Sequence, residues 1–174
     1  MVGINPDSSC YDGILLKHTP DQLGATIKAV LKGNYRTKTV TMAKSRLNDG
    51  QTLLAFNDFY IGANSHISSR YDIELNGKTE RQSSSGIIVS TGAGSTGWLS
   101  SVFNMANNIN QQSSQRTLRQ SIVSWDDEKL IFVVREPFLS KVTQVSIGFG
   151  IITRRQTLKI KSHMPTKGVI FSDG

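Results

Sequence analysis

A compact apolar run that stops abruptly in small residues constrains this chain more than any other feature. The apolar residues 86–89 are followed by residues 90–97, which are all Gly, Ala, Ser or Thr. This pattern predicts a buried strand that ends in a tight loop, because small side chains let another group approach the backbone closely. The N–H groups and hydroxyls of such a loop suit a phosphate or a ribose. Taken alone, the pattern fits an ordinary turn between a strand and a helix equally well.

The segment after this loop predicts a helix over residues 96–109, with Ser95 or Thr96 as its N-cap. Its apolar residues recur at helical spacing and share one face: Leu99, Val102, Phe103 and Ala106. The first N–H groups of a helix lack partners within the helix, so its N-terminus is a suitable place for an anion.

The rest of the chain is typical of strands and turns. Thr19 and Pro20 predict one further helix start, and Gly33 predicts its end. Turn residues at 48–50 and 76–77 predict hairpins, and the polar residues 107–115 predict a mobile loop. Strands are predicted over residues 37–47, 52–61, 70–80 (a hairpin), 130–134, 145–149, 157–161 and 169–171. These elements favour a mainly β (α+β) fold, a β-sandwich-like single domain over residues 1–174 with about two helices.

Charge and composition bound the partners of the chain. Its 174 residues carry 20 Lys and Arg against 13 Asp and Glu, and the formal net charge of +7 suits an anionic partner. The basic residues are scattered without an aromatic-rich RNA-binding signature, so we expect a small anionic substrate and no nucleic acid. No apolar run approaches the roughly 20 residues of a membrane helix, so we expect no membrane partner. One cysteine, Cys10, cannot form an internal disulfide and favours a cytoplasmic protein.

Metal and hydrolase sites are not indicated by the sequence. His18, His66 and His163 lie far apart, and no His, Cys or Asp cluster has the spacing of a zinc site. Residues 94–97 are one residue short of the Gly-x-Ser-x-Gly elbow of serine hydrolases.

A polar pair interrupts an apolar stretch upstream of the loop. Asn57 and Asp58 stand between residues 53–56 and 59–61, which are apolar. Burying two polar side chains is costly unless they find partners. The pair therefore marks either a bulge or a place where a ligand binds.

Two blocks of the sequence resemble the NAD kinase family. The family signature reads Asp-Gly, a short apolar run, Ser or Ala, Thr-Pro, Thr or Ser, Gly, Ser or Thr, and Thr-Ala-Tyr. The matching positions here are Gly86, Ser90, Thr91, Gly94, Ser95 and Thr96. Residues 54–61 resemble a second family motif, in which Ala, an apolar residue and Asn precede an acidic residue. Residues 2–5, the 70–80 hairpin and the ending 168–174 also resemble family segments, so the resemblance covers nearly the whole chain.

The sequence departs from the family pattern at several positions. Ser85 replaces the family Asp, Gly92 replaces the Pro, and Gly97 and Trp98 replace the Ala-Tyr pair. The Gly-Gly-Asp-Gly motif, which holds the catalytic Asp, does not occur, and residues 48–50 are typical of a turn instead. The resemblance therefore implies a C-terminal domain, with the catalytic Asp in an N-terminal domain outside this chain.

The resemblance also implies a function. The parent would be an ATP-dependent NAD kinase that uses ATP and Mg²⁺ and phosphorylates the adenosine ribose 2′-hydroxyl of NAD, giving NADP. This domain would bind the dinucleotide and form homo-oligomers, either dimers or tetramers, with no catalytic residue or metal ligand of its own. Trp98 would be either a core aromatic or a stacking partner for a base ring. The substrate-binding residues carried over by motif are Asn57, Asp58, Ser85, Ser90, Thr91, Gly94, Ser95, Thr96 and Trp98.

Two other functions stay open at this point. Kinases of lipids and sugars share the wider NAD kinase/diacylglycerol kinase-like superfamily, and Ser85 in place of the family Asp would fit a changed acceptor. A non-catalytic module that oligomerises its parent through a sheet also fits the β-rich pattern. Direct titration with NAD separates these alternatives from the first.

We predict that the 174-residue chain alone shows no NAD kinase turnover, because the Gly-Gly-Asp-Gly motif is not in it. The measurement is NADP formation from NAD, ATP and Mg²⁺, with a complete NAD kinase as the positive control. ATP-dependent NADP formation by this chain alone would contradict a division of labour between two domains.

Overall fold

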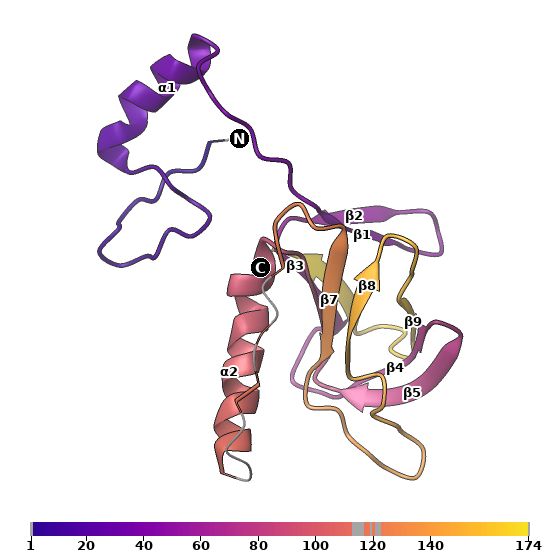
Figure 1. Cartoon of the computed structure of the whole chain (residues 1–174). Helices are drawn as coiled ribbons and strands as arrows, with labels where there is room; N and C mark the ends of the chain where they lie inside the picture. Colours follow the sequence, from indigo (N-terminus) through magenta and orange to yellow (C-terminus); the bar gives the residue numbers. More distant parts are fainter. Residues whose placement is uncertain (1, 113–116, 119, 121–122, 174) are drawn as a thin grey trace. The chain divides into compact units, whose positions relative to one another are not determined.

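The computed structural model describes residues 2–112, 117–118, 120 and 123–173 (Figure 1). Its contacts divide the chain into two compact units, Met1–Lys38 and Thr39–Gly174. The described residues form ten strands in three sheets and two α-helices. This architecture confirms the predicted mainly β, α+β fold.

The first unit is built around helix α1 (Leu23–Leu31), which follows the short 3₁₀ helix η1 (Pro20–Gln22). The Thr19 N–H donates to the side-chain oxygen of Gln22 at 3.3 Å, as expected for a helix start. Gly33 follows the helix with φ of 74°, a conformation that glycine adopts without strain. The predicted helix between Thr19 and Gly33 is confirmed.

The second unit holds the three antiparallel sheets. The largest has the strand order β10-β3-β6-β7-β8. Its strands are β3 (Asp58–Ala63), β6 (Ile87–Ser90), β7 (Lys129–Val134), β8 (Phe149–Thr153) and β10 (Gly168–Ser172). A three-stranded sheet has the order β5-β4-β9, from β4 (Ser69–Leu75), β5 (Lys78–Ser84) and β9 (Lys159–Ser162). The third sheet is the hairpin of β1 (Ala43–Arg46) and β2 (Thr52–Ala55).

The five-stranded sheet is the central layer and has an apolar core on each face. In β6, Ile87 and Val89 enter a core shared with the two smaller sheets, whereas Ile88 enters a core with helix α2 (Trp98–Gln111). Every residue of β6 is therefore buried, which explains why this strand is a continuous apolar run. In Figure 1, α2 lies beside β7, on the side away from β4 and β5. Leu99 is buried with Val102 and Phe103 beside it, as the helical pattern predicted.

Both predicted hairpin turns are confirmed. Asn76 and Gly77 join β4 to β5 with φ of 53° and 80°, the left-handed conformation that a two-residue turn requires. Residues 48–50 join β1 to β2, and Gly50 has φ of 89°. These turns fix the register of the two hairpins.

Four predicted segments differ from the structure. Of the predicted strand over 37–47, only residues 43–46 form a strand, β1. The predicted strand over 52–61 is two strands, β2 and β3, which belong to different sheets. Most of the predicted strand over 145–149 lies before β8, which begins at Phe149. The polar residues 107–111 form the end of α2, where the Asn107 side chain exchanges two hydrogen bonds with the backbone of Leu118. Residues 113–115 of the predicted mobile loop lie outside the described residues.

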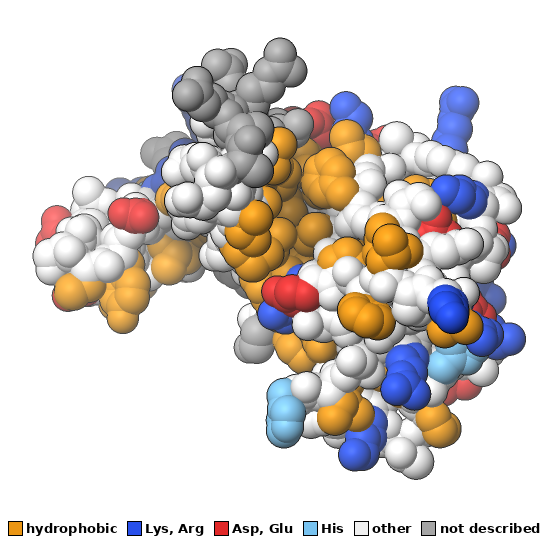
Figure 2. Space-filling model, turned by 90° about the horizontal axis from the view of Figure 1, so that it is seen from below, with side chains coloured by type: hydrophobic (Ala, Val, Ile, Leu, Met, Phe, Trp, Pro, Cys, Tyr) orange, Lys and Arg blue, Asp and Glu red, His pale blue; other side chains and the backbone are white. Residues whose placement is uncertain are grey.

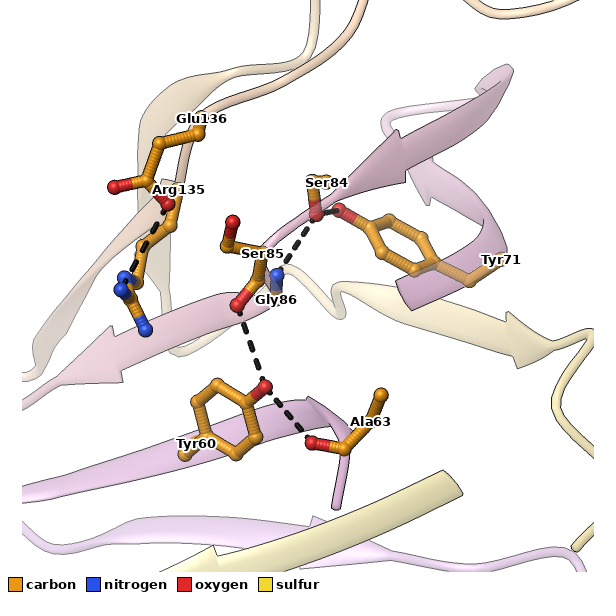
Figure 3. Close-up of polar contacts among 8 residues, drawn as sticks. All are labelled: Tyr60, Ala63, Tyr71, Ser84, Ser85, Gly86, Arg135 and Glu136. Atoms are coloured by element: carbon orange, nitrogen blue, oxygen red, sulfur yellow. Dashed lines mark hydrogen bonds and ion pairs between the residues drawn. The ribbon is translucent and has the colours of Figure 1, made fainter. Parts of the chain in front are cut away.

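A buried polar network fastens the three-stranded sheet to the start of β6 (Figure 3). The Tyr71 hydroxyl and Ser84 Oγ lie 2.7 Å apart, and Ser84 Oγ accepts the Gly86 N–H at 3.0 Å. The Tyr71 hydroxyl also donates to Gln82 Oε1 at 3.2 Å. Burial raises the pKa of Tyr71 to about 12, so its hydroxyl keeps the proton that it donates.

Glu80 is the charged member of this network, with a side chain that is 1% exposed. Its Oε2 accepts the Ile147 N–H at 2.9 Å and Gln82 Nε2 at 3.2 Å, and Lys78 Nζ lies 3.1 Å from its Oε1. Burial acts to raise the pKa of Glu80. The donors, including the Ser146 side chain, outweigh burial and lower that pKa to about 2.

We predict that Glu80→Gln lowers the free energy of unfolding at pH 7 by up to about 3 kcal/mol, the value of such a pKa shift. Because the folded-state pKa is depressed, this stabilisation is present above the ordinary pKa of 4.5 and is lost as pH falls towards 2. Urea denaturation of both proteins between pH 7 and pH 2.5 measures it. The control is Glu74→Gln, which removes a pair with Lys159 at the surface and should cost under about 1 kcal/mol. Equal costs for the two variants at pH 7 would contradict the prediction.

Candidate functional site

The candidate site lies where the predicted strand over 52–61 breaks. At this break, the N–H groups of Phe56, Asn57 and Asp58 all donate to the carboxylate of Asp173, at 2.9, 2.6 and 3.3 Å. The ladder between β10 and β3 brings Asp173 to this place from the far end of the sequence. One carboxylate thus accepts three consecutive backbone N–H groups, those of Phe56 and Asn57 between β2 and β3 and that of Asp58, the first residue of β3.

The carbonyl groups of the same three residues have partners as well. The Phe56 carbonyl accepts the Thr91 hydroxyl at 2.6 Å, and the Asn57 carbonyl accepts the Thr91 N–H at 2.9 Å. The Asp58 carbonyl accepts the Asp173 N–H at 3.1 Å. Thr91 and Asp173 together therefore satisfy every backbone polar group of the break. Below, residues 56–58 with these two partners are called the clamp.

Unlike the backbone groups of the clamp, the side chains of Asn57 and Asp58 have acceptor atoms without hydrogen-bond partners in the described part of the chain. Asn57 Oδ1 is buried and has no hydrogen-bond partner among the described residues. Asp58 is 8% exposed, and its carboxylate accepts no hydrogen bond from any residue that the structure describes. Burial, followed by the charge of Asp173, raises the pKa of Asp58. A buried polar atom without a partner is costly and calls for an explanation, and a buried group with a shifted pKa is a candidate for a functional site.

The small-residue loop uses most of its hydroxyls to hold its own shape. Thr91 Oγ1 accepts the Gly94 N–H at 3.1 Å, Ser95 Oγ donates to the Gly92 carbonyl at 2.7 Å, and Ser90 Oγ donates to the Thr91 carbonyl at 3.1 Å. Thr96 is exposed. The expected N-cap is wrong, because Gly97 precedes α2 and Ser95 is already engaged inside the loop.

The glycines of the loop lie against other backbone segments. A Cβ added to Gly94 would fall far inside contact distance of the Asn57 carbonyl, and one added to Gly92 would meet the Ser124 carbonyl. Neither glycine has a positive φ. What requires glycine here is the close approach of two loops.

Trp98 is the first residue of α2 and packs against the core that contains Leu99. Its ring stacks on Tyr60, with centroids 5.8 Å apart and planes 10° apart, and the guanidinium carbon of Arg135 lies 5.4 Å from its centroid. The Tyr60 hydroxyl donates to the carbonyls of Ala63 and Ser85, at 3.1 and 3.3 Å (Figure 3). Trp98 therefore has protein partners in this structure.

The sequence-predicted site residues fall into two groups. Asn57, Asp58, Thr91 and Gly94 are in direct contact, and Ser90 lies opposite Asp58 in the β3–β6 register. Ser95 and Thr96 continue the same loop. Ser85 instead precedes β6, at the other end of that strand from Ser90, and reaches Trp98 through Tyr60. The structure thus gathers the two sequence motifs at one end of β6 and leaves Ser85 at the other.

Sequence reasoning missed three residues that shape this region. Asp173 was noted only as part of an ending, and neither Tyr60 nor Arg135 was singled out. The available signal for Asp173 was an acidic residue directly after a strand, which is common at turns. Nothing in the sequence indicated that its partners would be the N–H groups of residues 56–58.

Asp72 forms ion pairs with Arg81 and His163 on the three-stranded sheet, but metal-binding groups do not gather among the described residues. No set of three or more His, Cys, Asp or Glu side chains among the described residues is arranged to hold a metal ion. On the face drawn in Figure 2, Lys and Arg side chains are mostly separated by other groups. Of the helices that the structure describes, none is long and apolar enough to cross a membrane.

We predict that Gly94→Ala lowers the free energy of unfolding by roughly 2–4 kcal/mol, because its methyl group would force the two loops apart. Urea denaturation followed through Trp98 and Trp125 fluorescence measures this loss. The control is Gly24→Ala in α1, where an added Cβ meets no atom within 4 Å. That control should be neutral or slightly stabilising. Wild-type stability in Gly94→Ala would show that the loops do not need this contact.

Comparisons with known proteins show the fold of the chain. No protein-family profile matches the sequence, and no curated protein matches it. Among solved structures, the yeast NADH kinase complexed with NADH matches with a TM-score of 0.65 and 19% sequence identity. The match covers 93% of this chain and 43% of the yeast chain, so this chain spans less than half of that enzyme's length. The chain therefore has the fold of a part of an NADH kinase.

Proposed function

We propose that this chain is the dinucleotide-binding domain of an NAD kinase-like phosphotransferase. The observation that carries the proposal is the unpartnered pair at the clamp, Asn57 and Asp58, within a fold like that of NADH kinase. The two sequence motifs that resemble the NAD kinase family meet at this pair. Their contact through Thr91 supports a common role for them.

The unpartnered groups have the chemistry that a dinucleotide would satisfy. Asn57 Oδ1 and the Asp58 carboxylate are acceptors, and both lack a donor among the described residues. NAD carries ribose hydroxyls, an adenine amino group and a carboxamide NH₂, all of which donate. We propose that Asn57 and Asp58 accept hydrogen bonds from these groups. A ligand donor would remove the cost of the buried acceptor.

In the same proposal, some of the other predicted residues hold the shape of the loop and others contact the ligand. Ser90, Thr91, Gly94 and Ser95 maintain the loop through the internal contacts described above. The exposed Thr96 and the nearby N-terminus of α2 would face a second part of the dinucleotide. Trp98 and Ser85 would contact the ligand only at the far end of β6.

The reaction of the parent enzyme would draw on groups outside this chain. The ribose 2′-oxygen of NAD would form a bond to the γ-phosphorus of ATP, and the bond to ADP would break. A carboxylate of the preceding domain would take the hydroxyl proton. The described residues do not fit a metal site, so no residue here is assigned to Mg²⁺. Positioning of the acceptor is the contribution that this chain would make. Homo-oligomers and a cytoplasmic location belong to the same proposal.

We predict that the chain binds NAD, and that Asn57→Ala weakens binding by 0.5–1.5 kcal/mol, about 2- to 13-fold, with little effect on folding. Calorimetry gives the affinity, and amide resonances of Asn57 and Asp58 show where NAD binds. Glu74→Gln, on the three-stranded sheet, is the control and should bind NAD as the wild type does.

The alternatives give different results in the same titration. Saturable binding of a lipid or sugar acceptor without NAD binding would favour a related kinase. If neither class binds and sedimentation shows assembly without nucleotide, the chain is an oligomerisation module. If Asn57→Ala lowers the melting temperature and weakens binding only in proportion, Asn57 is structural and the site assignment is wrong.

A further inference from the structure

We propose that Asp173 is a positioning residue, which holds the clamp so that the Asn57 and Asp58 side chains remain available to a ligand. This inference rests on the proposed function for its ligand, and on the geometry of the clamp for its mechanism. Asp173 acts through the backbone of residues 56–58, without touching the ligand.

Both the backbone N–H and the carboxylate of Asp173 form hydrogen bonds to residues 56–58. Its carboxylate accepts three N–H groups, and its own N–H donates to the Asp58 carbonyl at 3.1 Å. Asp173 has φ of 58°, a left-handed conformation that costs a non-glycine residue about 1 kcal/mol or more. The ladder between β10 and β3, in which Ser172 pairs with Phe59, holds the preceding residue in place. The surrounding structure therefore maintains a strained residue whose N–H group and carboxylate both bond to residues 56–58.

The carboxylate is required at this position because three donors converge on it. Oδ1 accepts the N–H groups of Asn57 and Asp58, and Oδ2 accepts that of Phe56. An ionised carboxylate is an acceptor at both oxygens, whereas an amide would turn an NH₂ group towards at least one of these donors. In Asp173→Asn, at least one backbone N–H would therefore face the amide NH₂, another donor, where it now bonds to a carboxylate oxygen.

The backbone bonds decide what the side chains of the clamp can do. If the N–H groups of residues 56–58 had no acceptor, Asn57 Oδ1 and the Asp58 carboxylate would be unbonded acceptors on the same short segment. Side chains turned back onto their own backbone could not meet a ligand. By occupying these donors, Asp173 leaves both side chains without a bond to their own backbone.

The negative charge of Asp173 also affects the pKa of Asp58, which can be measured. After burial itself, Asp173 is the charged group that raises the pKa of Asp58. A raised pKa means that ionised Asp58 is disfavoured until a donor or a cation meets it. The pKa of Asp58 therefore reports whether Asp173 is in place, even when no ligand is bound.

The experiment uses the 174-residue chain with Asp173→Asn, Asp173→Glu and the control Asp72→Asn. Asp72 is a matched acid, since it also accepts hydrogen bonds, but from the side chains of Arg81 and His163 in the three-stranded sheet. Carbon-detected NMR titration gives the pKa of Asp58, amide exchange gives the protection of residues 56–58, and calorimetry gives the NAD affinity.

We expect Asp173→Asn to lower the pKa of Asp58, to remove amide protection at residues 56–58 and to weaken NAD binding about tenfold or more. Asp173→Glu keeps the negative charge but moves the carboxylate oxygens. It should therefore preserve most of the rise in the pKa of Asp58 and lose part of the NAD affinity. Asp72→Asn should change none of these. If Asp173→Asn does not fold, the same comparison is made with Asp173→Glu, in which amide protection at residues 56–58 should fall.

Two results separate failure of this inference from failure of the proposed function. Unchanged amide protection and an unchanged Asp58 pKa in Asp173→Asn would overturn the positioning role, whatever the NAD affinity. If the comparison is made with Asp173→Glu, unchanged amide protection at residues 56–58 would overturn the positioning role of Asp173. A wild-type chain that does not bind NAD, while Asp173→Asn still shifts the Asp58 pKa and exposes the amides, would overturn the dinucleotide as ligand and support the clamp.

Discussion

The site of this protein depends on one constraint. Where the backbone leaves one sheet and enters another, its N–H and carbonyl groups must still find hydrogen-bond partners. Phe56 and Asn57 make that crossing from β2 to β3, and Asp58 begins β3, so their N–H groups need acceptors beyond the regular ladders. Thr91 from the glycine-rich loop and Asp173 from the last strand supply the missing partners. Because these two residues come from the two segments that flank β3 in the sheet, the crossing joins three separate parts of the chain. The loop glycines are a consequence, since Gly94 must lie against the same crossing.

The rest of the second unit keeps this crossing in place. The central sheet is apolar on both faces, so β3 and β6 cannot shift register without exposing buried residues. The three-stranded sheet is tied to the start of β6 by the hydroxyls of Tyr71 and Ser84, and to Ile147, before β8, by the buried carboxylate of Glu80. Polar groups with partners thus fix the sheets, and Glu80 Oε1, which accepts no hydrogen bond in the described part of the chain, has Lys78 Nζ 3.1 Å away. At the clamp, Asn57 Oδ1 is buried with neither a hydrogen bond nor a nearby cation among the described residues. That contrast is the physical reason to regard the clamp as the functional region.

Local sequence patterns predicted much of this fold but little of the site's geometry. The Asn76-Gly77 turn, the helix face of Leu99 and the buried strand β6 follow from interactions between near neighbours in the sequence, and the structure confirms them. The break at residues 56–58 divides what sequence alone presents as one strand, because which sheet each half joins is decided by distant segments. The hydroxyls of Ser90, Thr91 and Ser95 were predicted as ligand contacts, yet their partners are backbone groups that residue type cannot indicate. Asp173 shows the limit most clearly, since its three donors lie 115 to 117 residues away in the sequence.

That separation also has a consequence for how the protein is made. A ribosome releases the chain from its N-terminus, so Asn57, Asp58 and the glycine-rich loop emerge well before Asp173. Until β10 has been synthesised and has paired with β3, the N–H groups of the crossing have no carboxylate to accept them. Contacts between distant segments also form late in folding, because closing a long loop is entropically costly. A nascent or C-terminally trimmed chain can therefore have most of its sheets in place and still lack an ordered binding site.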